Sequence, residues 1–263
     1  MEAFVPIFRQ TVGPLGLDVP PLGECGFEEL AAAYQVRLEP GQGPVHIRGM
    51  TAMAECRAAL LAAKKLGCSP AWVSWVCDGE GRSPARVHML AALFVCEGMG
   101  AAGFGIDCPG ESARALLSEL AAYAGIPLFR ADGERMEPYP YAPAPRDPDA
   151  IPCATGTDPR FISPTIDVGE ELECGPDLLE DIIAAEDDPV GAVKIIIQSQ
   201  DDVEIFAQHQ YAVRDALCLC SDVPELLEQA LRLYQGRAFY DGTGGLERRD
   251  LDRLAELYGL IVL

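Results

Sequence analysis

The chain has 263 residues, enough for one large α/β domain or two small ones with a sizeable buried core. Apolar residues make up 49% of it and aromatic residues 7%, a globular composition that excludes a disordered or a collagen-like chain. The formal net charge of −21 provides no basic surface for nucleic acid or for an anionic membrane, so we expect neither as a partner.

The first half of the chain alternates short β runs with amphipathic helices. Strands are predicted at residues 45–48, 71–77, 103–107 and 127–130. Helices are predicted between them at residues 51–66, 87–97 and 113–124. Because parallel strands need helical crossovers, this repeat predicts a parallel sheet.

Residues 131–164 interrupt this alternation. Eight prolines lie between Pro138 and Pro164, and no periodic apolar pattern continues through them. We interpret the segment as a linker or a long irregular excursion, with a domain boundary at its end. The two domains expected are residues 1–163 and 164–263. An acidic stretch at 167–188 contains one short predicted helix at 177–185.

The strand–helix alternation resumes in the last part of the chain. Strands are predicted at residues 192–198, 216–220, 237–240 and 260–263. Helices are predicted at residues 203–210, 224–234 and 249–258, the second of them capped by Asp222. The fold class expected for the whole chain is therefore α/β.

The sequence carries no signal for export or membrane insertion. Its longest apolar stretches are far shorter than the roughly 20 residues of a membrane-spanning helix, and residues 1–6 lack a signal-peptide pattern. The ten cysteines form no C-x-x-C pair. They are expected to be reduced and buried, with Cys218 and Cys220 packed in the core on one strand face, which favours a cytoplasmic location.

Candidate ligand-binding residues follow the predicted strands, because parallel sheets bind ligands at their carboxyl ends. Asp78 and Asp107 are the substrate-binding candidates. Cys108 follows a strand and precedes a helix start, where a lowered pKa would make it a metal ligand or a nucleophile. Inert packing is the alternative for this thiol. Asp241 is predicted to be a turn residue.

Five segments, in order along the chain, resemble the homocysteine S-methyltransferase family. They are Val12-Gly13-Pro14-Leu15-Gly16 with Pro21-Leu22-Gly23 and Phe27-Glu28-Glu29, Met50-Thr51 with Glu55, Asp78-Gly79-Glu80-Gly81-Arg82, Gly105-Ile106-Asp107-Cys108, and Pro152-Cys153-Ala154-Thr155-Gly156-Thr157. The resemblance covers residues 12–162 and implies a (β/α)8 TIM barrel that lacks its first two units.

The resemblance also implies a zinc site, since this family holds zinc through three cysteine thiolates. Cys108 matches one of these ligands, whereas Ala154 and Thr155 stand where the other two are expected. Cys153, one position earlier, is the remaining candidate for a second ligand. Zinc binding deprotonates a thiol at neutral pH, so the bound thiol becomes a nucleophile for a methyl group.

Residues 166–263 resemble an extension found after the barrel in some bacterial members of this family. Residues 216–231 and the run Asp241-Gly242-Thr243-Gly244 also resemble pterin-binding barrels. This second part would either complete the truncated barrel or flank it. An Arg48-Gly49 pair replaces the Glu-Thr pair with which the family contacts its amino-acid substrate.

Two functions remain open from the sequence. The first is methyl transfer to a small-molecule thiol or amino acid in methionine and one-carbon metabolism, with an impaired zinc site. The second is a homologue without catalytic activity, a pseudoenzyme that binds a small ligand or a partner subunit. Apolar surface left by the missing barrel units would then favour a homo-oligomer or a partner chain.

Overall fold

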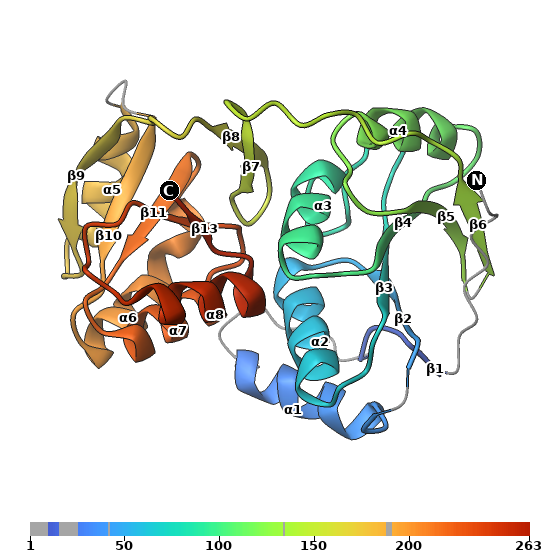
Figure 1. Ribbon diagram of the computed structural model, residues 1–263, viewed down its shortest axis with the longest axis horizontal. Helices are drawn as coiled ribbons and strands as arrows, with labels where there is room; N and C mark the ends of the chain where they lie inside the picture. The colour runs from blue at the N-terminus through green and yellow to red at the C-terminus, as the bar shows by residue number, and fades with distance from the viewer. Residues whose placement is uncertain (1–9, 16–25, 42, 134, 188–190) are drawn as a thin grey trace. The chain divides into compact units, whose positions relative to one another are not determined.

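The computed structural model describes residues 10–15, 26–41, 43–133, 135–187 and 191–263. The chain forms two units, Met1–Pro145 and Arg146–Leu263, each with its own sheets and helices (Figure 1). The division between them falls inside the proline-rich segment 131–164. Parts of the first family-like segment, residue 16 and residues 21–23, lie outside the described residues.

The first unit contains a six-stranded sheet whose spatial order follows the chain order. Its strands are β1 (Gln10–Val12), β2 (Val45–Met50), β3 (Ala71–Val76), β4 (Gly103–Asp107), β5 (Leu128–Asp132) and β6 (Arg135–Tyr139). Its helices are α1 (Phe27–Arg37), α2 (Met53–Lys65), α3 (Met89–Gly98) and α4 (Ser112–Ala121). Strands β1 to β5 pair in parallel, and β6 pairs antiparallel with β5.

The second unit repeats this arrangement in a five-stranded parallel sheet of order β9 to β13. Its strands are β9 (Val168–Glu173), β10 (Ala192–Ile196), β11 (Ala216–Cys220), β12 (Phe239–Tyr240) and β13 (Ile261–Val262). Its helices are α5 (Leu178–Asp187), α6 (Gln200–His209), α7 (Pro224–Leu233) and α8 (Arg248–Tyr258), with a 3-10 turn η1 (Gln210–Ala212). A separate two-stranded sheet consists of β7 (Ile151–Ala154) and β8 (Pro159–Ile162).

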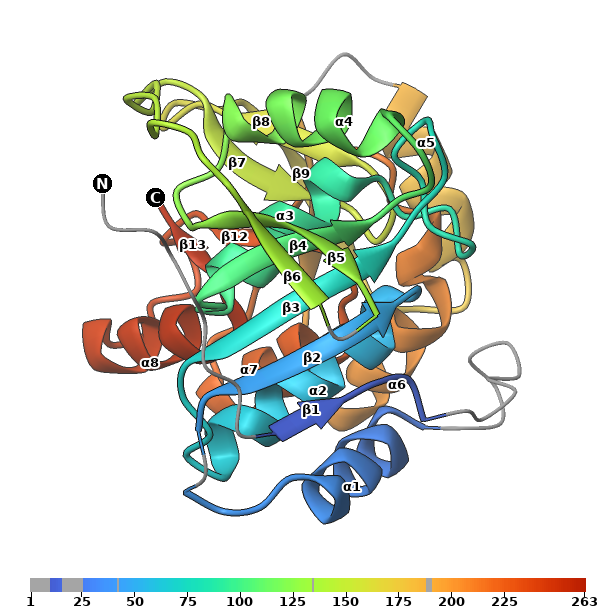
Figure 2. The same ribbon diagram turned by 90° about the vertical axis from the view of Figure 1, so that its right-hand side faces the viewer.

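The consecutive strand order distinguishes both sheets from doubly wound sheets, in which the order reverses. Each right-handed crossover adds the next strand on the same side, so the crossover helices remain on one face, as in a barrel. Figure 2 shows the first sheet from the face opposite these helices, with α2 and α3 behind the strands. The predicted α/β class is confirmed, and the first sheet is curled like half of a barrel.

The helices are short. The longest, α2, has 13 residues, and among the described residues no helix has the length and apolar character needed to cross a lipid bilayer.

One face of the first sheet is filled by aromatic rings that lie over the glycines of β4. A Cβ atom at Gly103 would lie 2.1 Å from Cζ3 of Trp72, and one at Gly105 would lie 2.1 Å from Cε2 of Phe129. The two rings meet edge to face with centroids 6.1 Å apart, and His46 meets Phe129 similarly at 5.8 Å. The two glycines of β4 therefore leave room for these rings. We call the five residues His46, Trp72, Gly103, Gly105 and Phe129 the aromatic face.

All eight predicted strands are present. Strands β4 and β11 have the predicted bounds, and β3 ends one residue earlier than predicted. The predicted helices are also present, with ends shifted by a few residues. The largest shifts are three residues, at the end of α4, which ends at Ala121 and not at residue 124, and at the start of α6, which begins at Gln200 and not at residue 203.

Two expectations about the middle of the chain are wrong. Residues 131–164 are not irregular throughout, because they contain β6, β7 and β8, and the acidic stretch contains the unpredicted strand β9. Pro138 lies in β6 and Pro152 in β7, both at sheet edges, where proline is tolerated because an edge N–H need not join the ladder. Edge strands such as these lack the apolar alternation that identifies a half-buried strand.

The predicted N-cap of α7 is also wrong. The cap position is Val223, and the helix begins with Pro224. Ser221, not Asp222, provides the local side-chain bond, since its Oγ accepts the N–H of Val223 at 3.1 Å.

Candidate functional site

Polar and sulfur-bearing side chains gather on one face of the second sheet. They come from β9, β10 and β11 and from the turn that follows β12. This thiol–lysine cluster consists of Glu171, Lys194, Cys218, Cys220, Asp241 and Thr243. It extends to the carboxyl ends of parallel strands, where α/β proteins bind ligands.

The pairing of the strands explains why these residues meet. Lys194 of β10 is the register partner of Cys218 in β11 and of Glu171 in β9. Side chains two residues apart share a strand face, so Cys220 lies on the same face as Cys218. Between Val168 and Glu171, β9 has one residue more than the facing part of β10. This bulge sets the face on which Glu171 points, and it brings the carboxylate to Lys194.

Asp241 follows β12 directly and is fixed by the turn that it begins. Its Oδ1 atom accepts the backbone N–H of Thr243 at 3.0 Å and the hydroxyl of Thr243 at 2.7 Å. Such a bond from the side chain to the backbone two residues later defines an Asx turn. The prediction that Asp241 is a turn residue is confirmed, and its second oxygen, Oδ2, faces Lys194.

Lys194 is a buried lysine whose ammonium has three acceptors. Its Nζ lies 2.9 Å from Oδ2 of Asp241, 3.0 Å from Oε1 of Glu171 and 2.8 Å from Oγ1 of Thr243. Desolvation lowers the pKa of Lys194, but the hydrogen bonds to the two carboxylates outweigh it and raise the pKa above its ordinary value. For Asp241, the hydrogen bonds from Thr243 and Lys194 outweigh desolvation and hold the pKa below its usual range. The pair is therefore ionised at neutral pH.

The two thiols lie beside this ion pair. Their sulfur atoms are 3.7 Å apart, and the S–H of Cys220 donates to Oδ1 of Asp241 at 3.2 Å. The hydrogen bond from Cys218 lowers the pKa of the Cys220 thiol, and the same bond, together with burial, raises the pKa of Cys218. Cys220 is therefore the more readily ionised thiol of the two.

Cys218, Cys220 and Asp241 could hold a metal ion. Their ligand atoms all lie within 4.8 Å of one another. Two sulfur atoms bound to one tetrahedral zinc lie about 3.8 Å apart, given Zn–S bonds of about 2.3 Å, and the sulfur atoms here are 3.7 Å apart. Two thiolates and one carboxylate are also a donor set that suits zinc, so the residues fit this ion.

The predicted site residues of the first unit meet at the carboxyl ends of β3 and β4. The thiol of Cys108 donates to the backbone carbonyl oxygen of Asp78 at 3.3 Å, and the N–H of Cys77 donates to the carbonyl oxygen of Asp107 at 3.0 Å. The side chain of Asp78 is used locally, since its Oδ1 accepts the N–H groups of the loop that follows at 2.9 Å. The bond from Arg82 lowers the pKa of Asp78.

The predicted pKa of Cys108 is wrong. Burial raises the pKa of this thiol, although the expected helix terminus would have lowered it. The physical reason is position, because α4 begins only at Ser112 and Cys108 lies four residues before it, 3% exposed. A dipole effect is confined to the first turn of a helix.

Cys153 lies in β7 of the second unit, fully buried. Burial raises the pKa of its thiol to about 12, in spite of Arg237 and Arg160, which lower it. Within the described ranges, neither Cys153 nor Cys108 belongs to a group of three potential metal ligands. The raised pKa does not by itself set Cys153 apart, since the pKa of Cys218 is raised as well. What sets it apart is the lack of neighbouring ligand atoms among the described residues.

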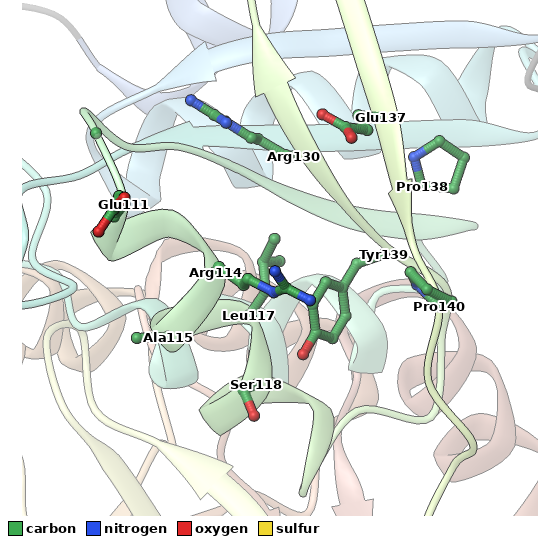
Figure 3. Close-up of a pocket in the computed structure, with 11 residues that line it drawn as sticks. Glu111, Arg114, Ala115, Leu117, Ser118, Arg130, Glu137, Pro138, Tyr139 and Pro140 are labelled. Carbon is green, nitrogen blue, oxygen red and sulfur yellow. The ribbon is translucent and has the colours of Figure 1, made fainter.

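A broad depression of about 970 Å³ lies on the first unit between α4 and the β5–β6 hairpin (Figure 3). Glu111 and Arg114 line it from the side of α4, and Arg130, Glu137 and Tyr139 line it from the hairpin. The two arginines and two glutamates balance in charge, and all four are exposed. Such exposed charges are well solvated, so this depression is a weaker candidate than the thiol–lysine cluster.

The cluster was only partly visible in the sequence. Cys218 and Cys220 were predicted to be buried on one strand face, which is confirmed, but their role was assigned to packing. Lys194 was not singled out, although it is one of three lysines in the chain and stands inside the apolar run Ala-Val-Lys-Ile-Ile-Ile. A charge at the centre of a buried strand was the available signal, because such a residue must find a partner.

Compared with known protein families and with curated proteins, the chain matches none. The function must therefore be inferred from the geometry of the cluster and from the motif resemblance.

Proposed function

We propose that this chain is a homocysteine S-methyltransferase-like protein that transfers a methyl group to a small thiol, with zinc held by Cys218, Cys220 and Asp241. The observation that carries the proposal is the meeting of two thiols and one carboxylate within 4.8 Å on one face of a parallel sheet. The resemblance of residues 12–162 supplies the reaction class. The consecutive strand order in both units supports derivation from a (β/α)8 barrel.

The number of ligands favours a catalytic metal site over a structural one. Structural zinc sites have four protein ligands, whereas catalytic sites have three and keep one position open. Zinc in this site would leave that position for a substrate thiol and would hold the thiol as a nucleophilic thiolate at neutral pH.

The residues of the chain contribute orientation and exclusion of water. Cys218 is fully buried and Cys220 is 2% exposed, so the thiols lie in a water-poor environment that strengthens charge interactions. Thr243 and Lys194 together fix both oxygens of the Asp241 carboxylate. The half-exposed carboxylate of Glu171 leads from the cluster to the surface.

A second function is favoured by different observations. The charged groups of the cluster already satisfy one another, as expected of a structural ion pair in a binding protein without catalysis. Ile183 and Tyr211 are also 53% and 73% exposed, on α5 and on η1, which contact each other. Exposed apolar side chains of this kind favour a partner subunit or self-association.

Metal content separates the two functions. We expect purified protein, incubated with Zn²⁺ and desalted, to retain about one equivalent of zinc, since protein zinc sites bind the ion tightly enough for it to remain bound during desalting. Cys220→Ser should reduce the retained zinc to roughly a tenth of this or less, since one thiolate ligand is lost. The zinc-loaded protein is then incubated with homocysteine and a sulfonium methyl donor, and methionine is measured by mass spectrometry.

The controls are the two cysteines that the sequence had suggested as ligands. Cys108→Ser and Cys153→Ser should retain zinc, because neither thiol belongs to the cluster. Zinc retention without methionine formation would favour the binding protein. No retained zinc in the unsubstituted protein would refute the proposed site.

A further inference from the structure

Lys194 occupies an unusual position for a lysine in this chain. The protein has three lysines, and the other two, Lys64 and Lys65, lie at the end of α2. Lys194 lies in the interior of β10 with its side chain only 6% exposed. Burying an ammonium is costly unless it is paired, so its three acceptors are what keep it in this position.

The two oxygens of Asp241 face different partners. Oδ2 is bound by Lys194 at 2.9 Å. Oδ1 faces the sulfur of Cys220 at 3.2 Å and also accepts both bonds from Thr243. The lysine and a metal ion would therefore use different oxygens of one carboxylate. This division of a ligand between the metal and an outer hydrogen-bond donor is common in metal sites.

The charges of the cluster favour the same arrangement. A divalent ion bound by two thiolates and one carboxylate has a net charge of −1, and the ammonium of Lys194 supplies the balancing charge at the outer oxygen. Glu171 also faces Lys194, but its side chain is 56% exposed, so solvent screens much of its charge. Tyr240, next to Asp241 in the chain, is a further ionisable group near the site.

We propose that Lys194 is the positioning residue of the metal site, holding the Asp241 carboxylate with Oδ1 towards the two sulfur atoms and balancing the charge of the bound centre. This inference rests on the proposed function, because it needs the metal. The competing interpretation is that the ammonium takes the place of a metal ion. The two interpretations predict opposite changes in metal affinity when Lys194 is replaced. Removal of a competitor strengthens metal binding, and removal of a positioning residue weakens it.

The test measures Zn²⁺ affinity by competition with a chromophoric chelator and, in parallel, the absorption spectrum of the Co²⁺-substituted protein. For Lys194→Gln we expect a loss of about tenfold to a hundredfold in Zn²⁺ affinity, the usual effect of losing an outer-shell partner. The Co²⁺ ligand-field bands should also change, because a loosened carboxylate alters the coordination geometry. Lys194→Arg keeps the charge and the donors and should recover most of the affinity.

Lys65→Gln is the matched control, since it removes the same charge from an exposed helix position and should leave both readouts unchanged. Folding of each variant is checked by circular dichroism. If Lys194→Gln does not fold, the double variant Lys194→Gln/Glu171→Gln removes one charge of each sign and should show the same loss of affinity.

The outcomes distinguish this inference from the proposed function. Equal or tighter Zn²⁺ binding by Lys194→Gln, with normal binding by the unsubstituted protein, overturns the positioning role and leaves the metal site intact. If the unsubstituted protein binds neither ion, both proposals fail together. Loss of affinity that Lys194→Arg restores supports the inference.

Discussion

The two units share a topology but fill their sheet faces with different chemistry. Both sheets have consecutive strand order, and their strands are parallel except for β6 in the first. In the first, Trp72 and Phe129 fill the aromatic face over two glycines. In the second, a lysine, two thiols and a carboxylate meet within hydrogen-bonding distance. The same backbone arrangement therefore supports a packed aromatic face in one unit and a cluster of charged and thiol side chains in the other, since a fold does not fix the chemistry of its sheet faces.

The largest expected effect is a loss of stability in the second unit, caused by Lys194→Met and measured on metal-free protein. The substitution leaves the largely buried carboxylate of Asp241 without its cation, which typically costs about 3–5 kcal/mol of unfolding free energy. Lys194→Met/Asp241→Leu should recover much of this loss, because an apolar pair needs no compensation. Lys65→Met is the surface control and should change stability by less than about 0.5 kcal/mol.

Urea unfolding with two probes assigns the loss to a unit. Both tryptophans of the chain, Trp72 and Trp75, lie in the first unit, so their fluorescence follows that unit alone. Circular dichroism follows both units. The transition seen by circular dichroism should move and the fluorescence transition should not. A loss below about 1 kcal/mol would mean that the ion pair is worth no more than a surface pair.

In the first unit, Gly105→Ala should destabilise by about 3 kcal/mol, the upper part of the range for overpacking. The new Cβ would lie 2.1 Å from the ring of Phe129, which would have to leave its place on the aromatic face. Gly175→Ala is the control in the second unit, since no described atom lies within 4 Å of its Cβ position. Tryptophan fluorescence should report the first loss, and an unchanged midpoint would show that the face is loosely packed.

The difference between the units also shows which parts of the structure the sequence could predict. Buried strands such as β4 and β11 were found because their side chains are apolar or small along the run, apart from Asp107 at the end of β4. Strands β6 and β9 were missed because edge strands can be polar. Strand β6 pairs with β5, the strand directly before it, whereas β9 pairs with β10 across helix α5.

The cluster depends on register, which local patterns do not specify. Lys194 and Glu171 meet only because of the bulge in β9, and Asp241 joins them from a turn 47 residues after Lys194. Cys108 shows the opposite case. Its place at a strand end was predicted correctly, but burial raises its pKa, and α4, which begins at Ser112 close to the predicted residue 113, lies too far along the chain to lower it.

The two units should lose stability in different pH ranges. Burial, and then Arg48, lower the pKa of His46 from 6.5 to about 4, so the unfolded chain binds this proton more readily than the folded one. The contribution of His46 is complete above pH 6.5 and is lost as the pH falls towards 4, with about 2 kcal/mol lost at pH 5. The stabilisation that follows from the lowered pKa of Asp241 is lost at lower pH, since it decreases only as the pH falls below 3.8.

Urea midpoints between pH 7 and 4.5 test this difference. The tryptophan transition of the first unit should fall over this range, and His46→Gln should flatten the dependence. A fluorescence midpoint that is independent of pH in the unsubstituted protein would contradict the assignment to His46.

The smallest expected effect concerns helix capping, in which the units also differ. In the second unit α6 has a capping box, where Ser199 Oγ accepts the N–H of Asp202 at 3.2 Å and Asp202 Oδ2 accepts the N–H of Ser199 at 3.0 Å. In the first unit α4 has Glu111 at its N-cap, whose side chain caps none of the described N–H groups. Ser199→Ala should therefore cost about 1 kcal/mol, and Glu111→Ala should cost less than about 0.5 kcal/mol. Ser199→Gly should cost only a few tenths of a kcal/mol, because water can reach the freed N–H when no side chain covers it. Equal losses for Ser199→Ala and Glu111→Ala would show that the hydrogen bonds of the capping box do not stabilise α6. The helix would then be held by the packing of Val203 and Phe206 in the core of the second unit.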